Sequence, residues 1–342
     1  MESGRQPKQG RTTEDILFVF GSSRGGTTFL SQILAEWFSY GMGPEGTFVK
    51  EIVRKAKKLG DLSSDDKCYE LAQQIVNAQM FRIIETRWEA KYAFAVHPDE
   101  IMERMPDRSA SSAIFAAHKV IADKQEKQRV GNKNPGYWRE LDTLNALFPL
   151  NAKYLFIVRD GRDVALSLKN VPWGGHSVYM AAAKWKKMAS AVREFEKKVK
   201  PGSILTIRYE DLLNKPGETI EAIGHFVGQI DMAEIRGKYE KAALENELGS
   251  NFGKWRNNMP VEDQQVYEAV VGDTLTDFGY ERCYPNAHLG YWPRFVYRVK
   301  EGLRMIRLNL YHLQSQLPQD LNKLKTSKLT DLVQPGKTNK PR

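Results

Sequence analysis

The stretch FVFGSSRGGTTFL, residues 18–30, joins an apolar run to a glycine-rich turn that ends in two threonines. The apolar run begins at residue 15 as DILFVF and predicts a buried strand, and residues 27–38 predict the helix after the turn. A glycine-rich turn between a strand and a helix points successive backbone N–H groups at one anion, and the helix adds its positive end. The stretch therefore predicts a phosphate site at the first strand of an α/β fold.

This turn departs at one position from the phosphate-binding loop (P-loop) of nucleoside triphosphatases. Gly21 and Gly26 have the spacing of that loop, but Thr27 stands where it has lysine. Arg24 places a permanent positive charge in the turn, and Thr27 and Thr28 offer hydroxyl groups to phosphate oxygens. The turn indicates a phosphate ligand without naming the nucleotide, and a plain strand-to-helix turn is the alternative.

A second anion site is predicted at the end of the apolar run KYLFIV, residues 153–158. Ligands of open α/β sheets bind at the carboxyl ends of the strands, and Arg159 stands at that end. Its planar guanidinium and the hydroxyl of Ser167 suit a phosphate monoester. A triphosphatase usually ends a neighbouring strand with an aspartate that supports magnesium, whereas this strand ends with arginine. Two anion sites together predict a bisphosphorylated nucleotide.

Strands and helices alternate along the chain, which predicts a P-loop-type, three-layer α/β fold with a central parallel sheet and helices on both faces. A third strand is predicted at residues 203–208 (SILTIR), between helices near 176–199 and 216–228. We expect the chain to be organised as a flexible N-terminus at 1–13, a main domain at 14–288 with a helical insertion at 48–128, an amphipathic helix at 289–318 and a basic, disordered tail at 319–342.

The bulk composition is that of an ordinary globular protein of 342 residues with a net charge of +9. The tail holds six Lys/Arg against two Asp, so part of the excess charge lies outside the predicted domain, and we expect no nucleic-acid partner. Two cysteines make no disulfide framework and fit a reducing compartment. The N-terminus lacks the apolar core of a signal peptide, and no run is long enough for a membrane span. We therefore expect a cytoplasmic protein.

Residues 292–317 carry a heptad stripe of apolar side chains, with Pro293 near its start and Pro318 after its end. The stripe consists of Trp292, Val296, Val299, Leu303, Ile306, Leu310, Leu313 and Leu317. The other face carries Arg294, Arg298, Lys300, Arg304 and Arg307. Such a helix can pack on its own domain, form a homodimer through a coiled coil, or make a peripheral contact with a membrane.

Four motifs, in order along residues 14–285, resemble those of sulfotransferases that use 3′-phosphoadenosine 5′-phosphosulfate (PAPS). They are GSSRGGTT, VRDGRDVALS, IRYEDLLNKP (207–216) and FGKWRNNMP (252–260), the last followed by FGYERC. The resemblance implies that the main domain is a sulfotransferase domain with PAPS as its cofactor and adenosine 3′,5′-bisphosphate as the product.

The same resemblance assigns the residues that bind the cofactor. The 5′-phosphosulfate would be held by the turn, which comprises Ser22, Ser23, Arg24, Gly25, Gly26, Thr27 and Thr28. Arg159 and Ser167 would bind the 3′-phosphate, and Tyr209 would lie near the adenine. A late loop with Lys254, Trp255 and Arg256 would close over the nucleotide. Tyr209 and Trp255 also suit a hydrophobic core, and Arg162 is expected to form a structural salt bridge.

Two departures from the family pattern stand out. The family often has Pro-Arg-Ser where this chain has Ser23-Arg24-Gly25. Gly25 removes a serine hydroxyl and costs backbone entropy, so we expect the turn to be more mobile. The catalytic histidine that cytosolic small-molecule sulfotransferases carry in a Thr-His-Leu context has no match here.

Sulfuryl transfer needs a base for the accepting hydroxyl, positive charge for the sulfuryl oxygens and an in-line geometry, and it has no obligatory metal. The stretch GMGPEGTF resembles the Gly-Glu-Glu-Thr region of tyrosylprotein sulfotransferases, which implies Glu45 as the base. Glu51, His118 and His176 are the alternatives, and Glu45 also suits a solvated helix start.

The positive charge is assigned in the same way. The segment Asn-Lys-Asn-Pro at 132–135 resembles the Asn-Lys-Asp-Pro segment of the tyrosylprotein enzymes. This implies that Lys133 lies beside the transferring sulfuryl group, with Arg24 on the phosphate side. A surface lysine is the alternative interpretation of Lys133.

The acceptor is the least constrained part of this interpretation. The helical insertion lies between the proposed base and Lys133, so we expect it to form a wall of the acceptor pocket. Trp88, Tyr92, Phe94 and Trp173 can stack on a sugar or pack a lipid, although aromatic residues are more often core. We expect a hydroxyl of a carbohydrate, glycolipid or small metabolite. A P-loop kinase or triphosphatase, and a non-catalytic nucleotide- or membrane-binding protein, are the other classes.

Overall fold

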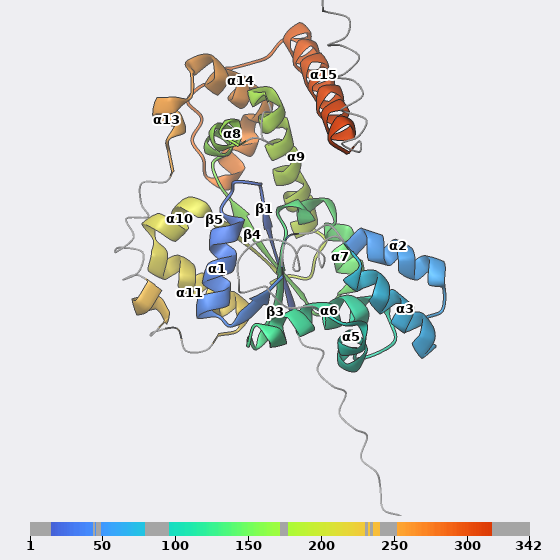
Figure 1. Ribbon diagram of the computed structural model, residues 1–342. Coiled ribbons are helices and arrows are strands. Elements are labelled where there is room, and N and C mark those ends of the chain that lie inside the picture. The colour runs from blue at the N-terminus through green and yellow to red at the C-terminus, as the bar shows by residue number, and fades with distance from the viewer. Residues whose placement is uncertain are drawn as a thin grey trace, which may run out of the picture. The chain divides into compact units, whose positions relative to one another are not determined.

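The computed structural model describes residues 15–43, 45, 49–78, 96–171, 177–229, 232, 235–239 and 252–316. In this part of the chain five strands form one parallel sheet in the order β2-β3-β1-β4-β5 (Figure 1). They are β1 (Ile16–Gly21), β2 (Tyr40–Met42), β3 (Arg129–Lys133), β4 (Ala152–Val158) and β5 (Ile204–Arg208). Helices cover both faces of the sheet, which confirms the predicted three-layer α/β fold.

The helices expected at residues 27–38 and near 176–199 and 216–228 all form, and the described part contains others that the sequence-based expectation did not name. The helices that flank the sheet are α1 (Thr27–Trp37), α2 (Val49–Leu59), α3 (Asp65–Val76), α5 (Pro98–Arg104), α6 (Ala110–Lys124), α7 (Leu141–Leu147), α8 (Gly161–Lys169), α9 (Val178–Glu196), α10 (Tyr209–Asn214), α11 (Pro216–Val227), α13 (Trp255–Asn258) and α14 (Val261–Val271). Three short 3₁₀ segments, η2 (Pro135–Arg139), η4 (Gly272–Thr274) and η5 (Thr276–Phe278), also lie in the described part.

Two strands, β2 and β3, were missing from the sequence-based expectation. Neither has an apolar run, because β2 is only YGM and β3 is RVGNK. Both pair with the sheet through backbone hydrogen bonds, which any side chain permits. Helices α2, α3, α5 and α6 form in the described part of residues 48–128, and the assignment of this segment as an acceptor-side insertion stays a prediction. Residues 79–95 of that insertion, with Trp88, Tyr92 and Phe94, lie outside the described residues, as does Trp173.

Strand β1 lies at the centre of the sheet and is buried on both faces, which explains its unbroken apolar run. Leu17 and Val19 belong to a core that includes α1, α10 and α11. Ile16, Phe18 and Phe20 belong to the other core, which includes α6, α9 and η2. Each fully buried side chain of this size contributes about 1.5–3 kcal/mol. The strand is therefore firmly held, and so is the point at which the phosphate turn begins.

The parallel register brings three strand ends to one edge of the sheet. Val19 pairs with Lys133 at the end of β3, and Gly21 pairs with Ile157 near the end of β4. A side chain at Gly21 would place its Cβ 2.4 Å from the carbonyl oxygen of Ile157, so only glycine fits there. The turn after β1, the segment after β3 and Arg159 after β4 consequently share the carboxyl edge of the sheet, where ligands of such folds bind.

The chain divides into two units, Met1–His288 and Leu289–Arg342. The sheet and its flanking helices belong to the first unit. In the second unit a helix, α15 (Tyr291–Gln316), forms where the heptad stripe predicts one. In the described residues, no helix has both the length and the apolar character needed to cross a bilayer.

Candidate active site

The turn after β1 has the backbone geometry of an anion site. Gly26 adopts a φ of 96°, and Arg24 adopts a φ of 66°, a left-handed conformation that costs a non-glycine residue about 1–2 kcal/mol. Helix α1 begins directly after Gly26, and no side chain caps its first N–H groups. Uncapped N–H groups at a helix start, with the positive end of the helix dipole, are suited to a phosphate.

Packing explains the two glycines of the turn. A Cβ at Gly26 would lie 2.4 Å from the ring of Tyr209. A Cβ at Gly25 would lie 2.5 Å from the Ser22 hydroxyl oxygen and 2.8 Å from the Ser22 carbonyl oxygen. In this turn Ser22 therefore occupies the space that a side chain at position 25 would need. The expectation that Gly25 makes the turn more mobile stays a prediction.

The hydroxyl of Ser22 provides a test of whether a phosphate fits the turn. Its oxygen is buried and has no hydrogen-bond partner among the described residues. A buried hydroxyl without a partner is costly, and a phosphate oxygen would supply one. The turn therefore has donors with unmet hydrogen-bonding capacity on both the backbone and a side chain.

Lys133 brings the predicted base and the phosphate turn together. It is the last residue of β3, and its side chain is 10% exposed. Its amino group forms an ion pair with the carboxylate of Glu45 and lies 3.4 Å from the hydroxyl oxygen of Thr28. Glu45 is itself half-exposed, with 49% of its side-chain area accessible. A carboxylate, an ammonium group and a phosphate-turn hydroxyl therefore meet at one point that solvent can reach.

The alternative bases lie in other surroundings. Glu51 forms an ion pair with Lys55 at 2.9 Å on α2. His118 on α6 is 1% exposed, and burial lowers its pKa to about 3. A base in that position is shielded from an acceptor that arrives from solvent. His176 lies outside the described residues.

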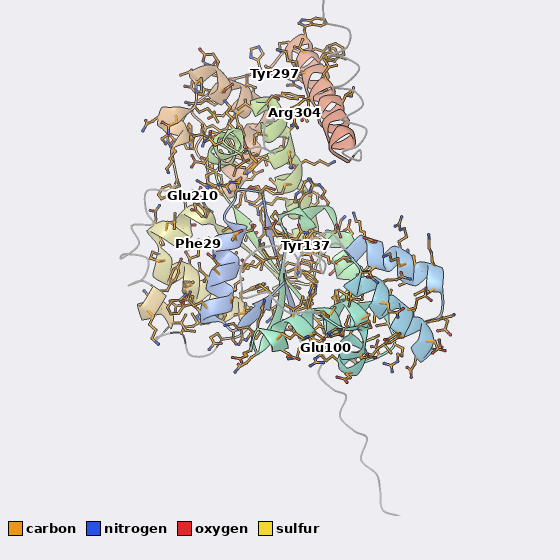
Figure 2. All side chains as sticks on the ribbon, in the orientation of Figure 1. Phe29, Glu100, Tyr137, Glu210, Tyr297 and Arg304 are labelled. Atoms are coloured by element: carbon orange, nitrogen blue, oxygen red, sulfur yellow. The ribbon has the colours of Figure 1, made fainter. Side chains whose placement is uncertain are left out.

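The second predicted anion site joins the first. Arg24 donates from Nε to the Ser167 hydroxyl oxygen at 3.0 Å, and Arg159 donates to the carbonyl oxygen of Arg24 at 3.2 Å. The guanidinium carbon of Arg159 lies 4.5 Å from the centre of the Tyr209 ring. Tyr209 is buried and packs edge-on against Phe29 of α1, which Figure 2 labels. Arg24, Arg159, Ser167 and Tyr209 thus form one connected group beside the turn.

Arg162 confirms its predicted structural role. It is 1% exposed and pairs with Asp160 at 2.8 Å and with Glu268 at 2.7 Å. Its guanidinium lies 3.6 Å from the centre of the Trp255 ring, and Trp255 is 2% exposed. Trp255 therefore belongs to the hydrophobic core beneath the late loop. From the sequence, this position was the alternative to a contact with the nucleotide.

Asp163 holds the late loop and was not predicted as a site residue. Its carboxylate accepts the backbone N–H of Gly253 at 2.6 Å and that of Trp255 at 2.9 Å. Burial raises the pKa of Asp163, although these two hydrogen bonds partly oppose the shift. Lys254 lies between the two anchored residues, and Arg256 follows and pairs with Glu281 at 3.3 Å. The only signal in the sequence is that Asp163 lies one helical turn before Ser167.

A cavity of about 40 Å³ adjoins the phosphate turn on the side of η2 and α9. Ser22 and Ser23 line it together with Arg139 of η2 and Lys184 of α9. Partial desolvation and then the positive charge of Arg139 lower the pKa of Lys184. Two cations thus border a cavity beside the turn. Sequence reasoning missed both, because Lys184 stands in a lysine-rich helix with no local feature that distinguishes it.

Comparison with known proteins identifies the family. Residues 16–232 match the model of the sulfotransferase family. The chain belongs to this family. A Caenorhabditis briggsae protein, provisionally named a protein-tyrosine sulfotransferase, is 25% identical over 272 residues, which are 78% of this chain and 81% of that protein. A Caenorhabditis elegans protein with the same provisional name is 30% identical over 118 residues, 33% of this chain and 43% of that protein.

Solved structures of sulfotransferases resemble this one in part. The sulfotransferase domain of the curacin biosynthetic pathway has a TM-score of 0.46 and 20% identity, and the alignment covers 79% of this chain and 99% of that domain. The mouse sulfotransferase SULT7A1, solved in complex with PAP, has a TM-score of 0.45 and 11% identity over 77% of this chain and 86% of its own.

Family membership confirms the resemblance inferred from the four motifs, and with it the class of enzyme. The individual site residues remain predictions that rest on the geometry above. In the described ranges, no group of three or more His, Cys, Asp or Glu side chains is arranged to hold a metal ion. That the reaction needs no metal also remains a prediction.

Proposed function

We propose that this sulfotransferase moves the sulfuryl group of PAPS to a hydroxyl group of an acceptor. The observation that carries the proposal is the position of the Lys133 amino group, which contacts both the Glu45 carboxylate and the hydroxyl of Thr28 in the phosphate turn. A base, a cation and an anion site within contact of one another are the parts that sulfuryl transfer requires.

Two anion sites support PAPS as the donor. The N–H groups at the start of α1 and the unpartnered Ser22 hydroxyl suit the 5′-phosphosulfate. Arg159 and Ser167, linked through Arg24, suit the 3′-phosphate. Tyr209 lies directly beneath Arg159 and gives the nucleotide site an aromatic wall.

The residues have distinct tasks in the transfer. PAPS supplies the sulfuryl group, whose sulfur forms a bond to the acceptor oxygen while its bond to the phosphate oxygen breaks. Glu45 takes the proton from the acceptor hydroxyl. Lys133 stabilises negative charge on the sulfuryl oxygens, and Arg24 stabilises the charge that develops on the departing phosphate. Glu45 is paired with Lys133, which holds its carboxylate towards the turn.

The acceptor hydroxyl belongs to a carbohydrate, a glycolipid or a small metabolite in this proposal. The half-exposed Glu45 leaves the base open to molecules that arrive from solvent. A tyrosine hydroxyl of a protein is a second candidate, because both Caenorhabditis relatives carry that provisional name. Radiolabelled PAPS with a panel of sugars, lipids and tyrosine peptides separates the two by the class of product that becomes labelled.

The first test is calorimetric titration with adenosine 3′,5′-bisphosphate and, separately, with ATP–magnesium. We expect tight binding of the bisphosphate, and a loss of about tenfold or more in Arg159→Ala because a charged hydrogen bond is worth about 1.5–3 kcal/mol. Arg54→Ala, at an exposed position on α2, is the matched control and should bind normally. A preference for ATP–magnesium, or equal binding by Arg159→Ala, would overturn the assignment of the nucleotide.

A further inference from the structure

Helix α15 exposes an apolar face between Tyr291 and Ile306. Six large apolar side chains on it are 43–86% exposed: Tyr291, Trp292, Phe295, Val299, Leu303 and Ile306. Five of them, from Trp292 to Ile306, recur at three- and four-residue steps and therefore share one face of the helix. The rings of Trp292 and Phe295 stack with their centres 5.7 Å apart. A contiguous exposed face of this kind marks an interaction surface.

The charge beside this face has one sign. Residues 291–316 contain five Lys/Arg and one acidic residue, Glu301. At 100° per residue, Lys300 and Arg304 follow one edge of the apolar face, and Arg294 and Arg298 lie towards the other. Arg304 is paired with Glu301 on the same helix. Figure 2 labels Arg304 and Tyr297 on α15. The apolar face is thus bordered by cations on both sides.

The positive charge of α15 favours one of two partners, an anionic lipid surface rather than a second copy of the helix. Two copies of α15 in a coiled coil would place like charges beside one another, without the acidic side chains that normally form pairs between helices. An anionic lipid surface is complementary instead, and each Lys/Arg near it contributes about 1 kcal/mol. Trp292 and Tyr291 also suit the boundary between water and lipid, where aromatic side chains with a polar group are favoured.

We propose that α15 lies along the surface of an anionic membrane. The apolar face of Trp292, Phe295, Val299, Leu303 and Ile306 enters the headgroup boundary, and the flanking Lys/Arg side chains contact the lipid phosphates. A helix of this composition binds parallel to the surface, because it has too many charges to span a bilayer. Binding of the chain to lipid is a property separate from sulfuryl transfer.

Flotation of the full-length protein with vesicles tests the proposal. The vesicles consist of phosphatidylcholine alone or of phosphatidylcholine with phosphatidylserine. We expect binding only to the vesicles that contain phosphatidylserine, and weaker binding at high salt. Two variants separate the contributions: Arg294→Glu with Arg298→Glu reverses charge, and Trp292→Ser with Phe295→Ser removes apolar contact. Each should weaken binding about tenfold or more.

The matched control reverses two exposed charges elsewhere. Lys57→Glu with Lys58→Glu on α2 changes the net charge equally and should float as the native chain does. Binding of adenosine 3′,5′-bisphosphate by every variant shows that the first unit is folded. Absence of flotation, or equal flotation of the Arg294/Arg298 variant, overturns the proposal. A dimer in solution that the Trp292/Phe295 variant loses assigns the face to a second copy and overturns it as well.

Discussion

Lys133 is a buried cation whose amino group lies between the Glu45 carboxylate and the phosphate turn. Its position follows from strand β3, which ends there and pairs with β1 at Val19. Strand pairing thus sets the distance between the lysine and the turn, and a lysine on a loop would not be held so well. A charge fixed in advance stabilises a transition state without reorganisation.

Lys133→Ala should lower kcat by about 10²-fold or more while leaving the affinity for adenosine 3′,5′-bisphosphate nearly unchanged. The reason is that its charge acts mainly on the sulfuryl group, which the bisphosphate lacks. Steady-state kinetics and calorimetry measure the two quantities. Lys187→Ala, at an exposed position on α9, is the control. A normal kcat in Lys133→Ala would assign this lysine to structure alone.

Glu45→Gln keeps the shape of the side chain and removes its ability to take a proton. We expect kcat to fall by about 10²–10⁴-fold, the usual contribution of a general base. Glu51→Gln should retain full activity, because Glu51 pairs with Lys55 on α2. If the loss occurred in Glu51→Gln and not in Glu45→Gln, the roles of the two carboxylates would be exchanged.

At the scale of elements, helix α8 carries two residues of the predicted nucleotide site on one of its faces. Asp163 and Ser167 are one turn apart on it, so the anchor of the late loop and a predicted phosphate ligand stand on the same side. Arg162 points instead into the core and pairs with Asp160 and Glu268. The helix therefore links the end of β4, the late loop and α14.

Asp163→Asn should weaken binding of adenosine 3′,5′-bisphosphate, and Asp163→Ala should weaken it further. The amide retains one acceptor oxygen for the two N–H groups of Gly253 and Trp255, whereas alanine retains none. We expect about tenfold for the alanine variant, with faster hydrogen exchange confined to residues 252–258. Asp142→Asn, 83% exposed in its side chain, is the control. Unchanged affinity and exchange would show that the late loop does not need this anchor.

Glu210 ties β4 to the C-terminal part of the first unit. Its carboxylate accepts the N–H of Asp160 and the hydroxyl of Tyr280, each at 2.9 Å, and Figure 2 labels it. Burial raises its pKa, so the folded state holds this proton more tightly than the unfolded state does. The contribution of Glu210 to stability therefore falls as the pH rises from about 4.3, its usual value, through the raised pKa.

Glu210→Gln should remove this pH dependence. Relative to the native protein, the variant should gain unfolding free energy as the pH rises through that window, because its amide does not ionise. Urea denaturation at several pH values between about 4 and 7 measures the difference. A difference that stays constant with pH would show that Glu210 does not titrate differently in the folded state.

At the scale of the whole molecule, both hydrophobic cores and all predicted site residues lie in the first unit. The cores consist of side chains from residue 16 to residue 280. The second unit contributes none of these core residues. The cytoplasmic location, the tail at 319–342 and the flexible N-terminus at 1–13 stay predictions, and the last two lie outside the described residues.

A chain that ends at His288 should therefore fold and bind adenosine 3′,5′-bisphosphate with native affinity. Saturation at a hundred times Kd should stabilise it by about 2.7 kcal/mol against unfolding, because the ligand binds only the folded state. Thermal denaturation with and without ligand measures this shift. Failure of the shortened chain to fold would place part of the stability in residues 289–342.

The sequence by itself determined those features that depend on residues adjacent in the chain. Strands β1 and β4 have apolar runs because their residues are mostly buried. The turn after β1 is recognisable in the sequence because its glycine, arginine and threonine residues are consecutive neighbours in the chain. The heptad stripe also lies within one continuous segment, so the sequence alone predicts the helix, and α15 forms there. Glu45 and Lys133 were named only through the resemblance to tyrosylprotein enzymes, because 88 residues separate them.

Only the tertiary structure decided those features that depend on contacts between distant segments of the chain. Strand β3, with polar residues, becomes a strand because β1 and β2 pair with it, and this pairing carries Lys133 to Glu45 and Thr28. Asp163 contacts a backbone N–H group about 90 residues away in the chain. Lys184 lines a cavity between helices that are distant in the sequence. Contacts between residues far apart in the chain produce no local sequence pattern, so only the folded structure reveals them.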